Sequence, residues 1–413
     1  MMAGITTFAT MAYVVVVNPR ILSEAGMPVQ GVLFATCISA ALATLIMGVW
    51  ANYPIALAPG MSLNAYFTYS IVIGRGVPWQ TALGVVFISG MLFLLLTLTN
   101  VREMIVNGIP DCLKYGTAAG IGLFIAFIGF RNARIIVAHP ATFVAFGKVS
   151  EPQVLLAAGG LLLIASLMAR RIGSAILIGI AATALAGIPL GLTHWPTQLF
   201  SLPHPGGTLL KLDLRAAAKF GLGDLIFIFF FVDLFDNVGT LIGVCQEGGF
   251  LRDGKLPRAS RALLADALGT IMGSLTGTST VTSYIESAAG VAAGARTGMG
   301  NLVIAACFVA AMFCSPIIAA IPSFATAPAL IIVGSLMCGA VAKVRWSDFT
   351  DGFPAFLTLV ATPLTFSIAT GLSLGMISFT LLKVATGRHR EVSPLIWILT
   401  ALFLLRYAFL GTH

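Results

Sequence analysis

Two stretches of this 413-residue chain decide how it folds. Residues 57–69 read LAPGMSLNAYFTY, and residues 277–290 read GTSTVTSYIESAAG. Each is short, and each is interrupted by small, polar or helix-breaking residues between long apolar segments. Non-helical backbone is tolerated at membrane depth only where protein buries it or where it faces a cavity. We therefore predict that residues 277–285 are extended or irregular and that a half-helix starts near Glu286.

The composition around these stretches is typical of a membrane protein. Hydrophobic residues make up 58% of the chain and charged residues only 9%, whereas about a quarter of a soluble domain is charged. Many windows reach the roughly 18 apolar residues that a spanning helix needs. The net charge of +8 is spread through loops, which indicates membrane topology rather than a nucleic-acid surface. We predict an all-α polytopic membrane protein.

The order of the apolar segments predicts two inverted repeats. Seven segments precede the polar loop 194–221, seven follow it, and one more ends the chain. The fifth and twelfth open alike, with IPDCLKYG at 109 and IPSFATAP at 321. An odd number of helices per repeat inverts the second half, and broken segments at matching positions indicate a transporter site. The segments are 3–22, 30–50, 56–73, 78–98, 109–130, 152–169, 173–193, 222–244, 258–276, 277–292, 298–320, 325–343, 352–369, 371–387 and 394–410.

Loop charges predict the orientation. With the N-terminus inside, most Lys and Arg residues fall in inside loops, and most of the others lie in the two longest outside loops, which follow the positive-inside rule least. We therefore predict a cytoplasmic N-terminus. The first apolar segment begins at Ala3 without a charged lead, so we predict no cleavable signal peptide.

Four acidic side chains lie deep in this division: Asp233, Asp236, Asp266 and Glu286. A charge at the bilayer centre costs about 3 kcal/mol or more, so such a residue needs a partner or a function. Asp233 and Asp236, in FVDLFDNVGT (231–240), are three apart and share one helix face. We interpret that face as the wall of a cavity, and Asp266 as a structural residue that pairs with Arg261 or caps a helix.

Glu286 ends the polar run STVTSYIE (279–286). The free N–H groups at the start of a half-helix there could bind a ligand acceptor. In the first half, Asn64 in MSLN takes the place that Glu286 takes in SYIE. The predicted site therefore pairs a neutral amide from one half with carboxylates from the other.

No motif indicates a metal or a cofactor. The six cysteines show no CxxC spacing, and the five histidines lie in loops or at the end of the chain. We predict no disulfide framework, no metal site, no cofactor and no enzymatic activity.

The segments LAPGMSLNAYF (57–67), FVDLFDNVGTLIGV (231–244) and GTSTVTSYIESAAGV (277–291) resemble the signature segments of the adenine/guanine/hypoxanthine permeases. These permeases form the azaguanine-permease-like branch of the nucleobase:cation symporter-2, or nucleobase–ascorbate transporter, family, which is related to the uracil permeases. GITTFATMAYVVVVNPRIL at residue 4 and LLADALGT at residue 263 also resemble this branch. The similarity covers nearly the whole chain.

The resemblance implies a uracil-permease-like fold of about fourteen segments in two inverted seven-segment repeats, with short strands in segments 3 and 10. Segments 1–4 and 8–11 would form a core domain, and the others a gate domain. Residues 394–410 are then either an extra peripheral helix or a sign that 352–387 is divided wrongly. The implied boundaries are 1–100 and 222–320 for the core, and 101–221 and 321–413 for the gate.

The resemblance also implies the site. The substrate-contacting carboxylates of the family fall on Asp233 and Glu286, and a binding asparagine falls on Asn64. Asp236 matches a second acid with a role in coupling or local structure. We add Tyr284 and Phe231 as rings that could stack on the substrate. Burial of neighbouring carboxyl groups favours protons shared among Asp233, Asp236 and Glu286, so a proton, rather than sodium, is the expected coupling ion.

The implied function is secondary active import of hypoxanthine, guanine or adenine across the cytoplasmic (inner) membrane by proton symport, with an elevator-like movement of the core against the gate. The expected partners are a purine nucleobase and membrane lipid, with no nucleic acid; a homodimer stays open.

Three alternatives also stay open. An anion transporter of the same fold would favour a basic residue at the site, and segments 3, 8 and 10 contain none. A channel would lack saturable uptake. An intramembrane aspartyl protease could use GLGD at 221–224, although it needs a second aspartate on an earlier facing helix.

Overall fold

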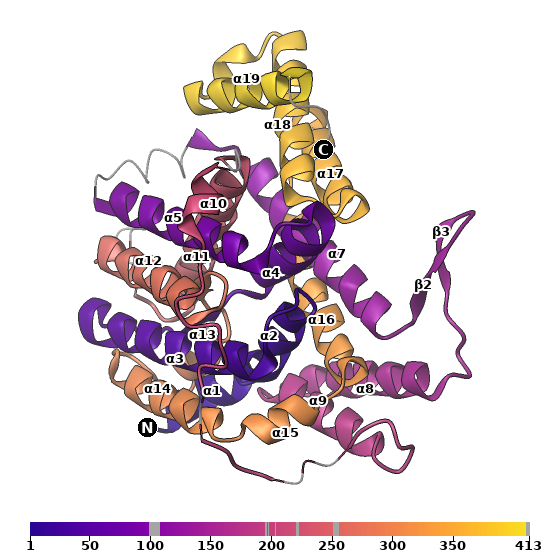
Figure 1. Cartoon of the computed structure of the whole chain (residues 1–413). Coiled ribbons are helices and arrows are strands. Elements are labelled where there is room, and N and C mark those ends of the chain that lie inside the picture. Colours follow the sequence, from indigo (N-terminus) through magenta and orange to yellow (C-terminus); the bar gives the residue numbers. More distant parts are fainter. Residues whose placement is uncertain are drawn as a thin grey trace.

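The computed structural model describes residues 1–98, 108–194, 196, 198–202, 204–219, 223–250 and 256–409. Within these ranges, eight helical stretches are long and apolar enough to cross a membrane. The protein is therefore a multi-pass membrane protein built almost entirely from helices (Figure 1).

The first half contains the predicted segments with one addition. A two-stranded hairpin, β2 and β3, occupies the predicted outside loop 131–151 and projects from the helices (Figure 1). The elements are α1 (Met2–Met11), α2 (Val14–Ser23), α3 (Val29–Ile46), η1 (Met47–Ala51), β1 (Leu57–Pro59), α4 (Met61–Ala65), η2 (Tyr66–Ile73), α5 (Trp79–Leu98), α7 (Asp111–Asn132), β2 (Ile136–His139), β3 (Phe143–Phe146), α8 (Pro152–Ala169) and α9 (Ala175–Ala186).

The second half repeats this order after a long connection. Its elements are α10 (Leu214–Lys219), α11 (Gly223–Glu247), α12 (Ala259–Thr276), β4 (Val281–Ser283), α13 (Ser287–Ala292), α14 (Met299–Met312), α15 (Ser315–Ala320), α16 (Ser323–Cys338), η3 (Gly339–Lys343), α17 (Phe349–Thr365), α18 (Ile368–Ala385), η4 (His389–Glu391) and α19 (Pro394–Phe409).

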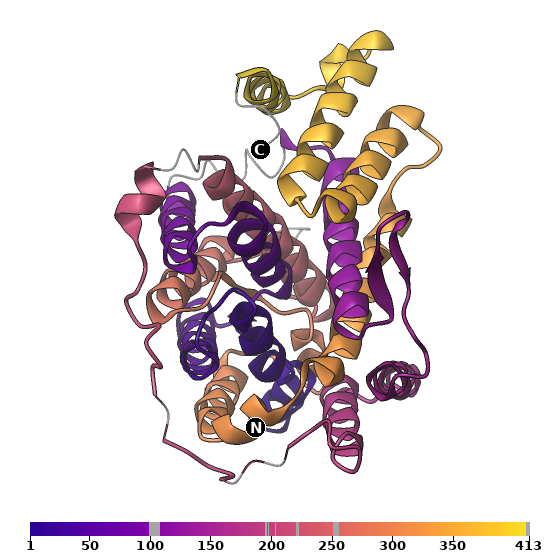
Figure 2. The same cartoon turned by 45° about the vertical axis from the view of Figure 1, so that its right-hand side comes forward.

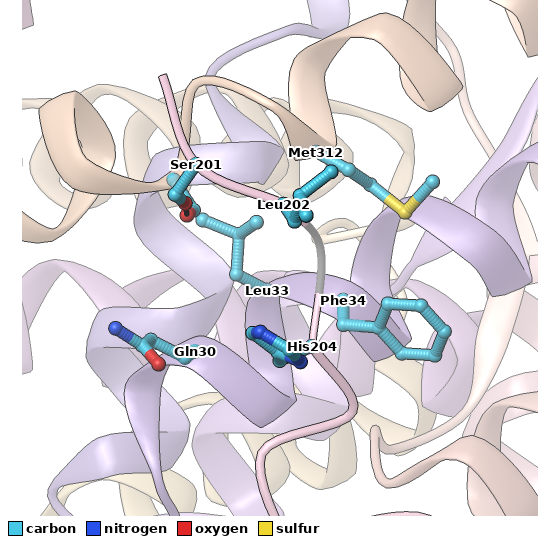
Figure 3. A pocket seen from close by; sticks show the side chains of 8 residues that line it. Gln30, Leu33, Phe34, Ser201, Leu202, His204 and Met312 are labelled. Carbon is cyan, nitrogen blue, oxygen red and sulfur yellow. Dashed lines mark hydrogen bonds between the residues drawn. The ribbon is translucent and has the colours of Figure 1, made fainter. Parts of the chain in front are cut away.

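The connection between the halves lies against the ends of α3 and α14 (Figure 3). Ser201 N donates to Phe313 O at 3.0 Å, and the Ser201 and Ser315 hydroxyls lie 2.6 Å apart. A small cavity of about 110 Å³ remains beneath this segment. It is lined by Gln30, Leu33, Phe34, Ser201, Leu202, His204, Met312 and Ser315.

The two broken stretches meet as an antiparallel strand pair. β1 pairs with β4, with Leu57 opposite Ser283 and Pro59 opposite Val281. The prediction of extended backbone followed by a half-helix is confirmed in the second half, where α13 begins one residue after Glu286. In the first half, β1 is followed by the short helix α4.

The hydrogen bonds around the strands repeat across a local two-fold axis. Gly60 N donates to Thr280 O, and Tyr284 N donates to Ala56 O, each at 3.0 Å. Because Gly60 and Tyr284 each follow a strand directly, they occupy equivalent positions in the two halves.

Each strand is also held in the same way by the helix that precedes it. On α3, the Thr44 hydroxyl accepts from Leu57 N at 2.9 Å and donates to Leu57 O at 3.0 Å. On α12, the Thr270 hydroxyl accepts from Val281 N at 3.2 Å and donates to Val281 O at 3.1 Å. One threonine thus satisfies both polar groups of the first strand residue, which would otherwise be costly at membrane depth.

The similar openings of the fifth and twelfth segments also have a structural counterpart. Gly122 of α7 and Gly334 of α16 both lie thirteen residues after the Ile-Pro opening of their segment, and the two helices cross at these glycines. A Cβ built on Gly122 would lie 2.6 Å from the carbonyl oxygen of Gly334, and one on Gly334 would come closer still to that of Gly122. Small residues at a crossing let membrane helices approach closely.

The helices pack in two groups (Figure 2). One contains α1, α3, α5, α11, α12 and α14, and the other contains α7, α8, α9, α16, α17 and α18. The boundaries of the predicted core, 1–100 and 222–320, and of the predicted gate, 101–221 and 321–413, stay predictions. The division into two domains that move relative to one another stays a prediction.

The C-terminal segment is a separate helix that packs on α18. Ser373 and Tyr407 have hydroxyl oxygens 2.5 Å apart, and those of Thr380 and Thr400 are 2.8 Å apart. Because one residue number rises as the other falls, α19 runs antiparallel to α18. Residues 349–385 form two helices, α17 and α18, and residues 394–409 form α19, so α19 is an additional helix rather than a result of dividing 352–387 wrongly.

An ion network joins the start of α17 and the end of α18 to η4, the short helix that precedes α19. Lys383, only 1% exposed, lies 3.0 Å from Asp351 and 2.8 Å from Glu391. Arg388 donates to Asp348 at 2.8 Å and to Glu391 at 2.7 Å. Thr350 and Arg388 lower the pKa of Asp348, and Arg388 and Lys383 lower the pKa of Glu391 to about 2.

This network gives an expected pH dependence of stability. A depressed folded-state pKa stabilises the fold above the unfolded pKa, and this stabilisation is lost as the pH falls through the folded pKa. Arg388→Gln should therefore lower the melting temperature in detergent by about 1–3 °C at pH 7, the size expected of exposed ion pairs. The difference should shrink between roughly pH 4 and pH 2. A difference that is constant over this range would mean that these ion pairs do not stabilise the fold.

Candidate functional site

The site is built around the β1–β4 pair, where α11 lies against β4 and α13. Asp233 of α11 is 2% exposed. It lies 3.5 Å from the hydroxyl of Thr270, which also holds the first residue of β4. The structure thus places the first predicted carboxylate next to the residue that fixes the strand.

Asp236 lies one turn further along α11 and meets the other half of the chain. The hydroxyl of Ser62, in the first turn of α4, donates to Asp236 Oδ2 at 3.2 Å. Asp236 is therefore held by the half-helix that follows β1.

Glu286 precedes the first residue of α13. Its Oε1 accepts a hydrogen bond from the hydroxyl of Tyr13 at 2.8 Å, and its backbone oxygen lies 3.4 Å from the hydroxyl of Thr10. Tyr13 lies at the break between α1 and α2. The Glu286 carboxylate is thus held by the break between the first two helices of the chain.

The strand register corrects the predicted pairing of Asn64 with Glu286. Since Gly60 and Tyr284 are equivalent, the residue two positions later is Ser62 in the first half and Glu286 in the second. Asn64 lies inside α4, one half-turn beyond that position. The sequence comparison of MSLN with SYIE misses this because it cannot show where each strand ends.

Asn64 is fully buried and belongs to an amide chain. Its Nδ2 donates to Asn18 Oδ1 at 2.5 Å, and Asn18 Nδ2 donates in turn to Thr36 at 2.7 Å and to Thr278 at 3.0 Å. This series of hydrogen bonds links α2 and α3 with both broken stretches. Asn18, inside the opening apolar segment and directly before Pro19, could have been singled out from the sequence as a polar residue at membrane depth.

Tyr284 has a structural contact in addition to its predicted role. Its ring is 6% exposed, and its hydroxyl donates to Pro59 O of the facing strand at 2.5 Å. Beside it, Ser283 donates to the Asn237 side-chain oxygen. These bonds fix β4 against both β1 and α11.

Phe231 packs within α11, and its role as a ring that stacks on the substrate stays a prediction. Its ring packs against Phe227 with centroids 5.6 Å apart. It is two positions from Asp233, and residues two apart on a helix face different directions. Phe229 is four positions from Asp233 and shares its face, and its ring meets Tyr66 at 5.5 Å.

Two other acidic residues, Asp266 and Asp224, were given predicted roles from the sequence. Asp266 is fully buried in the middle of α12, so it does not cap that helix, and its structural pairing with Arg261 stays a prediction. Of the GLGD motif, Gly221 and Leu222 lie outside the described residues, as does the side chain of Asp224.

Several buried polar atoms around the strands have no hydrogen-bond partner among the described residues. They include Asn64 Oδ1, Asn237 Nδ2, Thr280 Oγ1 and Thr282 Oγ1. Unsatisfied buried groups are costly unless something pairs with them. Together with the three carboxylates, they offer a polar ligand both donors and acceptors, and β1, α4, α11, β4 and α13 contain no Lys or Arg.

Tyr13, Ser62 and Thr270 are the residues that sequence reasoning missed. Each is an ordinary hydroxyl residue in an apolar segment, and no local pattern shows that it faces a carboxylate. Among the described residues, no three His, Cys, Asp or Glu side chains group in a way that could hold a metal ion.

Comparison with known proteins shows the family. The sequence model Xan_ur_permease, Permease family, matches residues 1–374. Guanine/hypoxanthine permease PbuO of Bacillus subtilis is 45% identical over 412 residues, covering 98% of this chain and 95% of that protein. Adenine permease AdeP of Escherichia coli is 43% identical over 412 residues, covering 100% of this chain and 93% of that protein.

Among solved structures, the transmembrane domain of the cyanobacterial bicarbonate transporter BicA aligns with a TM-score of 0.65 at 17% identity. The alignment covers 88% of this chain and 96% of the BicA chain. At this identity the likeness shows the fold alone, which agrees with the predicted inverted-repeat transporter architecture. The chain belongs to the Permease family and is a membrane transporter, not an enzyme.

Proposed function

We propose that this permease is a secondary active importer of purine nucleobases. The observation that carries the proposal is the convergence of Asp233, Asp236 and Glu286 with Asn64 around one buried strand pair. The names of the guanine/hypoxanthine and adenine permeases that it resembles support purines as the substrate class.

The chemistry of the site suits a purine. An ionised carboxylate only accepts hydrogen bonds, so Asp233 and Glu286 would accept them from the ring and exocyclic N–H groups of the purine. Asn64 Oδ1 has no hydrogen-bond partner among the described residues. It would accept a hydrogen bond from another edge of the purine. The predicted free N–H groups of the half-helix after Glu286 are not available to a ligand, because Ser287 N, Ala288 N and Ala289 N donate to the backbone oxygens three residues earlier. Tyr284 stays a candidate to stack on the ring.

We further propose proton symport with an elevator-like motion. Asp236 and Glu286 are both partly buried beside the strand pair, so binding a proton at one of these acids would relieve repulsion between neighbouring carboxylates as the substrate arrives. The helices of the predicted core, 1–100 and 222–320, would carry the site past the predicted gate, 101–221 and 321–413. The protein would lie in the cytoplasmic membrane with its N-terminus inside.

Radiolabelled uptake in a host that lacks purine uptake tests the substrate class. We expect saturable uptake of at least one of hypoxanthine, guanine and adenine, because the donors and acceptors of the site match a purine edge. Uracil and bicarbonate serve as controls and should not accumulate. Uptake of bicarbonate without any purine would favour the anion-transporter alternative, and uptake that does not saturate would favour a channel.

The same purified protein in proteoliposomes tests the coupling ion. An inwardly directed proton gradient should drive accumulation of the transported purine, and a protonophore should abolish it. Accumulation driven by a sodium gradient alone, without proton movement, would contradict proton symport but would leave purine transport intact.

A further inference from the structure

The carboxylate of Glu286 accepts a hydrogen bond from the first apolar segment of the chain. Tyr13, 2% exposed, donates its hydroxyl to Glu286 Oε1 at 2.8 Å. These residues are 273 positions apart, and they lie in opposite halves of the chain. The contact therefore depends wholly on the tertiary fold.

The tyrosine is well placed to hold a carboxylate still. α1 ends at Met11 and α2 begins at Val14, so Tyr13 lies in the short break between them. Around it, Tyr13 O accepts from both Val16 N and Val17 N, which fixes the start of α2. A hydroxyl on a fixed backbone and a rigid ring loses little freedom when it donates a hydrogen bond.

Close packing keeps α1 and α13 together. A Cβ built on Gly290 would overlap the hydroxyl of Thr7 and would lie 2.9 Å from Ala3 O. One turn further along α1, the Thr10 hydroxyl lies 3.4 Å from the backbone oxygen of Glu286. Thus α1 packs along α13. Beyond the end of α1, Tyr13 adds the hydrogen bond to the Glu286 carboxylate.

The other side of the local two-fold has the matching arrangement with the chemical groups exchanged. There, the acid lies on the long helix, as Asp236 of α11, and the hydroxyl lies after the strand, as Ser62. By the strand register, Ser62 is the counterpart of Glu286. Each side of the two-fold therefore has one hydroxyl–carboxylate pair, and Glu286 accepts from a hydroxyl at the break between α1 and α2.

We propose that Tyr13 is a positioning residue for substrate binding, which orients the Glu286 carboxylate so that one oxygen is fixed and the other is presented to the substrate. This inference rests on the proposed purine transport. A hydrogen bond from a neutral donor to a charged acceptor is worth roughly a tenfold change in an equilibrium constant or more. Its loss should therefore appear in substrate affinity and leave the folded transporter in place.

Tyr13→Phe tests the proposal, because it removes the hydroxyl and keeps the ring. We expect the KM for the transported purine to rise about tenfold, with Vmax per folded transporter within about twofold of the parent. Tyr407→Phe is the matched control, since its hydroxyl bonds Ser373 on the remote α18–α19 contact. It should change neither value by more than about twofold.

The amount of folded transporter is measured in parallel by size-exclusion chromatography and thermal unfolding. If Tyr13→Phe lowers the yield, the Kd of the purified monodisperse protein for the purine replaces KM, and the same rise is expected. An unchanged KM and Kd would overturn the inference, as would a loss of stability without a loss of affinity. A parent that transports no purine would instead refute the proposed function.

Discussion

Replacing Asp233 by Asn is expected to reduce purine uptake by about 100-fold or more. The change keeps the size of the side chain but turns an acceptor-only group into one that also donates. A site built to hydrogen-bond its ligand discriminates strongly against a mismatched group. Asp233 is buried beside Thr270 and β4, so water cannot easily take over the lost interaction. Initial rates of uptake at several substrate concentrations measure the effect.

Asp111→Asn is the control for this experiment. It makes the same chemical change at a side chain that is 72% exposed and pairs with Lys114 at 2.8 Å. Uptake by this variant should equal that of the parent. If Asp233→Asn transports purines at the parental rate while both proteins fold, Asp233 does not contact the substrate and the proposed site is wrong.

Gly334→Leu is expected to have the largest effect on folding. Gly334 crosses Gly122 so closely that a Cβ would overlap the facing carbonyl oxygen. That oxygen belongs to the backbone, so it cannot rotate away, and α7 and α16 would have to separate. Overpacking a tight contact costs about 1–3 kcal/mol or more, and here the two helices are central to their packing group. We expect little monodisperse protein and a melting temperature lower by several degrees.

Gly339→Ala provides the comparison on the same helical stretch. Nothing lies within 4 Å of a Cβ built at Gly339, and its φ of −56° suits any residue. This variant should keep the parental yield and melting temperature. A Gly334→Leu protein as stable as the parent would show that the α7–α16 crossing can widen without cost.

Much of this architecture could be predicted from residue patterns. The apolar segments, the two broken stretches and the likeness of the fifth and twelfth openings are local features, and local features survive without knowledge of the fold. They predict inverted repeats because an odd number of spans reverses the second repeat. Asp233, Asp236 and Glu286 were recognisable for a related reason, since a carboxylate in an apolar helix is costly and therefore conspicuous.

Other features were decided only by the tertiary structure. The register of β1 on β4 makes Ser62, not Asn64, the counterpart of Glu286, and no pattern within either stretch carries that register. The partners Tyr13 and Thr270 are common hydroxyl residues, whose burial against a carboxylate depends on which helices pack together. A charged residue in an apolar segment stands out in the sequence because placing it at membrane depth without a partner costs free energy. The neutral groups that make the charge tolerable become visible only when the chain folds around it.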